Sequence, residues 1–135
     1  ADWRPHAKSM SLAELTSHMA TCPHWAVGIC EQDAFEVPSE YTPWIAKSLD
    51  ELLATYDASI ASAKKAMAGL SDAQMRATWK LLDDGQTVLE APRATVLRWF
   101  IHSHLIHHRG QLTVYLRLKD VPLPAIYGPS ADEHP

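Results

Sequence analysis

The chain has 135 residues, a formal net charge of −4 and 47% hydrophobic residues, which indicates one globular domain over residues 1–135. The acidic balance argues against a nucleic-acid partner, because such proteins usually carry a basic surface. No apolar run approaches the ~18 residues of a membrane-spanning helix. Two cysteines, Cys22 and Cys30, are too few for a disulfide framework, so we expect a reduced, cytoplasmic protein. Cys22 falls on an apolar stripe, where a small buried role is expected.

The first long helix is predicted to begin at Ser11, because Ser11 and Glu14 have the spacing of a capping box. Apolar residues then recur at helical spacing as far as Ile29. Pro23 lies inside this pattern and should kink or split the helix, since proline lacks a backbone donor. Residues 31–42 break the periodicity and are predicted to form a link.

The second long helix is predicted to begin at Thr42 and Pro43, a capping residue followed by a residue suited to the first turn. Its apolar stripe is long and regular, and Gly69 marks the expected end. Ser71 is predicted to cap a short helical turn. Residues 79–91 are not helical in pattern.

A third long helix is predicted from Pro92 to about Lys119, after a turn signal at Asp84 and Gly85. The proline-rich residues 120–135 should form an irregular strap lying on the helices. Together these elements predict an all-α domain. Three such helices more often belong to a four-helix arrangement, so the chain is one helix short of a bundle.

The histidines are the most informative local feature. His104 and His108 are four residues apart, so they share one helix face, where they replace apolar residues on the inward stripe. His18 lies on the apolar stripe of the first long helix. Three imidazoles from two facing stripes would make a divalent metal site with open positions, a pattern typical of catalytic metal sites.

Structural roles compete with this interpretation. A single histidine on an apolar face, such as His18, is usually a hydrogen-bonded core residue, and many histidine pairs four residues apart are incidental. His107 flanks the stripe as a weaker ligand candidate or a supporting group. Gln111 faces inward and could orient a ligand or substrate or make an ordinary core contact, while Arg109 flanks His108. The remaining histidines are expected at the surface: His6, His24, His102 and His134.

Several segments together resemble one known family. The C-terminal run extends from His104 to Leu112, and continues with Tyr115-Leu116-Arg117, Pro122 and Pro124, and residues 127–133. The earlier segment is Leu15-Thr16-Ser17-His18, followed by Trp25. These residues resemble the DinB family of DNA-damage-inducible proteins, and the resemblance covers essentially the whole chain.

The resemblance implies an up-down-down-up four-helix bundle that holds a divalent metal through His18, His104 and His108. Members of that family usually carry a helix before the lead-in found here at residues 3–6, so the first helix is expected to be missing from this chain. Family members include thiol S-transferases that use low-molecular-weight thiols and a mycothiol-dependent maleylpyruvate isomerase.

We therefore expect a metal-dependent transferase that acts on a small-molecule electrophile and a low-molecular-weight thiol. Zinc or nickel is the expected metal, because imidazole suits both, and Arg109 and Gln111 would position the substrate. The alternatives are a non-catalytic, stress-related bundle that binds a metal or small molecule, and a metal-dependent hydrolase. No acidic residue falls on the His104 and His108 stripe to favour hydrolysis. Uncovered apolar surface on the long helices predicts a homodimer.

Overall fold

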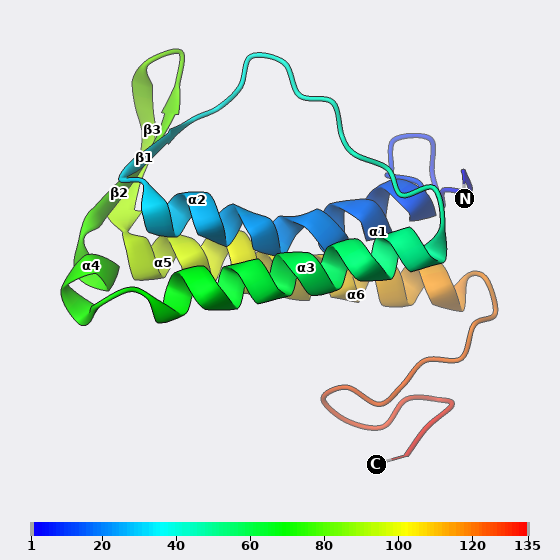
Figure 1. The fold of residues 1–135 in the computed structure, drawn as a ribbon. Coiled ribbons are helices and arrows are strands. Elements are labelled where there is room, and N and C mark those ends of the chain that lie inside the picture. The colour runs from blue at the N-terminus through cyan, green and yellow to red at the C-terminus, as the bar shows by residue number, and fades with distance from the viewer. Residues whose placement is uncertain (1, 135) are drawn as a thin grey trace.

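The computed structural model describes residues 2–134, which form three long helical rods with a small sheet at one end (Figure 1). The first two rods run in the same direction, and the third runs antiparallel to them. The first rod comprises α1 (Leu12–Thr21), η1 (Cys22–His24) and α2 (Trp25–Glu31); the second is α3 (Leu49–Ala68); the third comprises α5 (Arg93–Leu97), η2 (Arg98–Ser103) and α6 (His104–Arg117).

A three-stranded mixed sheet shows that the all-α prediction is wrong. Its strands are β1 (Ala34–Glu36), β2 (Thr78–Asp83) and β3 (Gln86–Pro92), in the order β1-β2-β3. β1 pairs in parallel with β2, and β2 pairs antiparallel with β3. The three-residue β1 is paired only with a strand far along the chain, so its own sequence carries no local strand signal. The predicted turn is confirmed, because Asp84 and Gly85 adopt φ angles of 49° and 72° between β2 and β3.

The predicted capping boxes at the starts of two helices are confirmed. The hydroxyl of Ser11 accepts the backbone N–H of Glu14, whose carboxylate accepts the backbone N–H of Ser11. Ser71 and Gln74 form the same reciprocal pair at α4 (Asp72–Arg76). Pro23 splits the first rod as predicted, since the chain tightens there into the 3-10 turn η1.

The predicted start of the second long helix at Thr42 and Pro43 is wrong, because α3 begins at Leu49. The Ser48 hydroxyl accepts the backbone N–H of Glu51 and caps the helix six residues later than Thr42 would. The irregular segment before Ser48 spans the length of the bundle, which lets α3 run parallel to the first rod (Figure 1).

The last rod begins and ends close to the predicted positions but contains an unexpected turn. Pro92 precedes the first helical residue, and α6 ends at Arg117 rather than Lys119. Between α5 and α6 the six residues of η2 form a π-helix, which is wider than an α-helix. Residues 118–134 are irregular, as expected.

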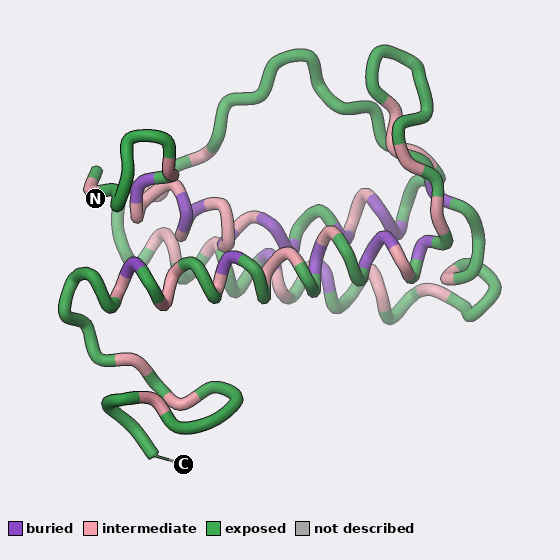
Figure 2. Tube along the Cα trace, turned by 180° about the vertical axis from the view of Figure 1, so that it is seen from behind, coloured by how far each residue is buried: buried purple, intermediate pink, exposed green. Residues whose placement is uncertain are grey.

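The core lies between the rods at the sheet end. Trp79 of β2 belongs to the same buried cluster as Ile29 of α2 and Val96 of α5, so the sheet contributes a large side chain to the helical core. Buried residues gather where the rods face one another (Figure 2). The sheet thus closes one end of the bundle.

Arg93 ties the sheet to the helices and is only 4% exposed. Its guanidinium donates to the carbonyls of Ile29 and Gln32 at the end of α2, to the carbonyl of Gln74 in α4, and to the carboxylate of Asp33. The Ile29 and Gln32 carbonyls lie at the end of α2, where the last carbonyls have no partner within the helix. One buried cation therefore binds the end of α2 and also contacts α4 and Asp33.

Replacing Arg93 should destabilise the fold far more than replacing an exposed charge. Arg93→Met would remove the donor to the buried Ile29 carbonyl and break the contacts with Gln32, Gln74 and Asp33, and we expect a loss of about 3 kcal/mol in the free energy of unfolding, measured by urea denaturation. The control is Lys80→Met, because Lys80 pairs with Glu90 at 3.6 Å on the exposed sheet surface and such a pair contributes at most about 1 kcal/mol. Equal losses for the two variants would contradict the role given to Arg93.

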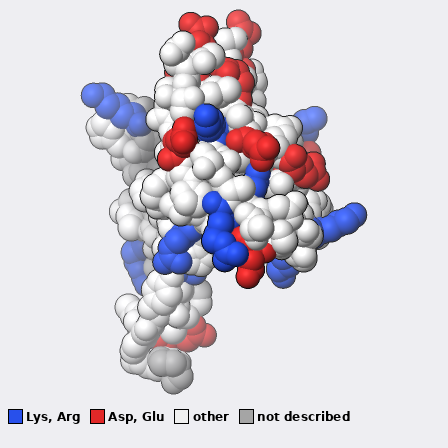
Figure 3. Space-filling model, turned by 90° about the vertical axis from the view of Figure 1, so that its left-hand side faces the viewer, with Lys and Arg blue, Asp and Glu red and all other residues white. Residues whose placement is uncertain are grey.

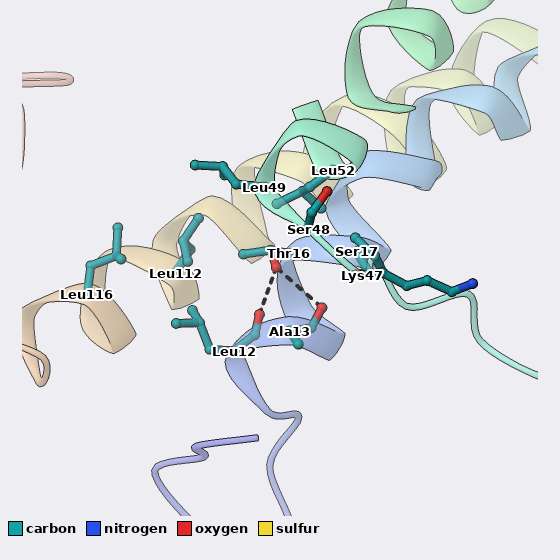
Figure 4. A pocket seen from close by; sticks show the side chains of 11 residues that line it. Leu12, Ala13, Thr16, Ser17, Lys47, Ser48, Leu49, Leu52, Leu112 and Leu116 are labelled. Carbon is teal, nitrogen blue, oxygen red and sulfur yellow. Dashed lines mark hydrogen bonds between the residues drawn. The ribbon is translucent and has the colours of Figure 1, made fainter. Parts of the chain in front are cut away.

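An apolar groove lies along the bundle between α1, α3 and α6. Its volume is about 430 Å³, and leucines from all three helices line it: Leu12, Leu49, Leu52, Leu112 and Leu116 (Figure 4). α1 packs between α3 and α6. Three helices therefore contribute apolar side chains to one groove.

Candidate metal centre

Three histidines converge at the contact between α1 and α6. The Nε2 atom of His104 lies 3.3 Å from Nε2 of His18 and 2.8 Å from Nε2 of His108. One ring nitrogen from each of the three residues lies within 4.8 Å of the others, and no acidic side chain joins this group within residues 2–134. The structure therefore brings together the three side chains that the sequence predicted as metal ligands.

The local structure explains the convergence. His104 and His108 occupy consecutive turns of α6, which places both rings on one face of the helix. His18 reaches them from α1, which packs against α6. The Tyr115 hydroxyl donates to the Met10 carbonyl at 3.0 Å, and Trp3 packs edge-on against the Tyr115 ring. These contacts join the start of α1 to α6 about two turns beyond His108.

Two of the rings are held by carbonyl oxygens on their outer side. Nδ1 of His104 lies 3.3 Å from the Phe100 carbonyl, and Nδ1 of His108 lies 2.7 Å from Oε1 of Gln111. A carbonyl can only accept, so both Nδ1 atoms carry the proton and both Nε2 atoms present a lone pair. Two lone pairs that face each other at 2.8 Å repel unless a cation lies against them.

The surroundings favour neutral imidazoles, which are the forms that bind metal. Burial, with smaller contributions from His108 and His104, lowers the pKa of His18 to about 4. Burial also lowers the pKa of His108, although the hydrogen bond to Gln111 opposes this shift. These two imidazoles are therefore uncharged at neutral pH.

The aromatic surroundings of the site are asymmetric. Trp25 lies against two of the histidines, with ring centroids 5.5 Å from His18 and 5.6 Å from His104, and it is 37% exposed. His107 is exposed and stacks edge-on against His108 at 4.9 Å, on the flank expected from its position. The Phe100 side chain packs against the core, and its backbone carbonyl contacts the ring of His104.

Gln111 lies beside the histidine group, whereas Arg109 contacts the C-terminal segment. Gln111 contacts His108 and so reaches the site through a histidine. Arg109 turns toward the C-terminal segment, where its guanidinium donates to the Tyr127 hydroxyl at 2.6 Å and lies over that ring. Arg117 and Asp132 form a second tie between α6 and this segment. The remaining histidines are exposed as expected: His6, His24, His102 and His134.

Two contacts at the site have no sequence signal. The Phe100 carbonyl is a backbone atom, and its availability depends on the π-helical turn. Cys22 is fully buried as expected, but its Sγ also lies 3.8 Å from Nδ1 of His104. Burial raises the pKa of the Cys22 thiol to about 11, so it is protonated at neutral pH.

Comparison with known proteins decides the family. The model of the DinB family matches residues 2–134. The chain belongs to the DinB family. Both the N-terminal segment with His18 and the C-terminal run with His104 and His108 lie within the matched range.

Two relatives of this DinB protein come from Bacillus subtilis. The uncharacterized protein YrdA is 41% identical over 44 residues, a match that covers 33% of this chain and 26% of YrdA. A solved structure of a DinB-like protein, YjoA, superposes with a TM-score of 0.66 at 21% identity, covering 90% of this chain and 78% of YjoA. The match to YrdA thus spans about a quarter of that protein, and the match to YjoA supports the fold alone.

Proposed function

We propose that this DinB protein binds one divalent metal ion through His18, His104 and His108 and transfers a group onto a low-molecular-weight thiol. The observation that carries the metal site is the pair of Nε2 lone pairs 2.8 Å apart, each fixed by a carbonyl acceptor on the opposite nitrogen. A site that fixes neutral imidazoles in this way suits zinc or nickel.

Three neutral ligands cancel none of the charge of a divalent ion, which leaves the centre suited to anions. When bound, such an ion would supply a positive charge and an open position that favour the thiolate form of a thiol at neutral pH. No carboxylate lies within the histidine group in residues 2–134. This supports a thiol, which ionises readily, over a hydrolytic water that an acidic residue would activate.

The residues around the centre suit a partly apolar electrophile. Trp25 presents an aromatic surface beside His18 and His104 and is partly exposed. In the transfer, the thiol sulfur bonds to a carbon of the electrophile, the leaving group departs with its bonding pair, and the thiol proton passes to solvent. Gln111 supports His108 in this scheme, while Arg109 contributes through the C-terminal segment that it holds.

Removing a central histidine should abolish metal binding. We expect purified wild type to hold one zinc or nickel ion per chain after loading, and His104→Ala to hold almost none, measured by elemental analysis. The matched control is His102→Ala, because His102 lies two residues away on the same rod and is exposed. Full retention of metal in His104→Ala would contradict the site.

Thiol consumption tests the reaction. With bacillithiol, mycothiol or glutathione and a model electrophile, the metal-loaded wild type should consume thiol faster than His108→Ala by at least about tenfold, since that histidine fixes the ion. His102→Ala should match the wild type. If metal binds but none of these thiols is consumed above the metal-free background, the protein is a binding bundle without this activity.

We also propose that the protein forms a homodimer through the apolar faces that border the groove. Leu49 and Leu53 of α3 are 67% and 52% exposed, and Val114 of α6 and Leu118 just after that helix are each 57% exposed. Large exposed apolar patches usually contact a partner, and a second copy offers the same side chains across a two-fold axis.

The sheet end of the molecule is a weaker candidate for an apolar interface, because its surface is charged. Lysines and arginines alternate with acidic residues over the sheet end of the molecule (Figure 3). No helix within residues 2–134 combines the length and apolarity needed to cross a bilayer. Cys22 and Cys30 are both free and buried. We propose a reducing, cytoplasmic setting because two cysteines are too few for a disulfide framework.

Sedimentation equilibrium at micromolar concentration tests the dimer. The wild type should sediment as a dimer and Leu53→Glu as a monomer, because the new carboxylate would lose its hydration in the interface. Val88→Glu is the control, since Val88 is 57% exposed on β3, far along the chain from the groove. A wild type that is monomeric at these concentrations would refute the dimer.

A further inference from the structure

The π-helical turn changes the hydrogen-bond partner of His104. The backbone N–H of His104 donates to the carbonyls of Ile101 and Trp99, three and five residues earlier. In an α-helix it would donate to the carbonyl four residues earlier, which belongs to Phe100. The carbonyl of Phe100 is therefore available to the ring of His104, whose Nδ1 lies 3.3 Å from it.

A second helical irregularity reaches the same carbonyl. Cys22 begins the 3-10 turn η1 in the first rod and is fully buried. Its Sγ lies 3.4 Å from the Phe100 carbonyl, to which the thiol donates, and 3.8 Å from Nδ1 of His104. The thiol thus lies beside the outer edge of the His104 ring, opposite Nε2.

We propose that Cys22 is a positioning residue, which with the Phe100 carbonyl fixes the tautomer and orientation of His104. This inference rests on the proposed metal site, because its consequence is an Nε2 lone pair aimed at His18 and His108. The Cys22 thiol donates to the Phe100 carbonyl beside Nδ1 of His104, and this hydrogen bond holds the carbonyl oxygen in place as the acceptor for that ring. Groups that support a metal ligand in this way keep it oriented before the metal arrives.

Two replacements separate the thiol's hydrogen bond from its volume. Cys22→Ser keeps a donor in a slightly smaller side chain, whereas Cys22→Val fills the space without a polar atom. The matched control is Cys30→Val, because Cys30 is also buried on the first rod but packs in the core at the sheet end. Circular dichroism would establish that each variant is folded before comparison.

Two readouts are needed, one of them without metal. Long-range proton–nitrogen NMR of the metal-free protein reports which nitrogen of His104 carries the proton, and competition with a chromophoric chelator reports zinc affinity. We expect the wild type, Cys22→Ser and Cys30→Val to keep the proton on Nδ1. Cys22→Val should show a mixture of tautomers and a zinc affinity about tenfold weaker, with Cys22→Ser within about threefold of the wild type.

Two outcomes would overturn the inference. If Cys22→Val keeps the wild-type tautomer and affinity, the thiol does not position His104. If Cys22→Ser and Cys22→Val lose affinity equally with an unchanged tautomer, Cys22 acts through packing alone. A tautomer change in Cys22→Val in a protein that binds no zinc would support the positioning role and refute the proposed metal site, so the two failures are distinguishable.

Discussion

The close approach of three imidazole nitrogens between α1 and α6 is the constraint around which the rest of this structure is organised. Nε2 of His104 and Nε2 of His108 face each other at 2.8 Å while carbonyl oxygens hold the protons on their outer nitrogens. Burial lowers the pKa of both His18 and His108, which favours their neutral forms at neutral pH. The proposed metal cation, bound between these nitrogens, would make the arrangement favourable.

The fold around this point holds the two helices in register. At one end Tyr115 hydrogen-bonds to the Met10 carbonyl, just before α1 begins. At the other end Arg93 joins the close of α2 to α4 and to Asp33 at the start of the sheet. Because the rods are tied at both ends, the histidines near the middle have fixed relative positions. The small sheet thus serves the site indirectly, by fixing where the third rod starts.

Most of the correct predictions came from the helical periodicity of apolar residues and from helix-capping residues. The Ser11 and Ser71 caps, the break at Pro23 and the inward positions of His18, His104 and His108 all follow from local spacing, which is why these predictions succeeded. The strand β1 was missed because it is three residues long and pairs with a strand more than forty residues later. Thr42 and Pro43 fit the rule for a helix start as well as Ser48 does, so the local sequence does not decide where α3 begins. The path of the linking segment across the bundle decides it. The π-helical turn has no residue signature, so the roles of the Phe100 carbonyl and Cys22 emerged only in three dimensions.

X-ray absorption at the metal edge of the zinc-loaded protein tests the central claim most directly, because it reports the atoms bound to the ion. Three imidazole nitrogens at about 2.0–2.1 Å, with one or two further light atoms, are the predicted coordination. A sulfur ligand at about 2.3 Å would show instead that a cysteine holds the ion. A shell of oxygen atoms without the outer-ring scattering of imidazole would contradict the three-histidine centre altogether.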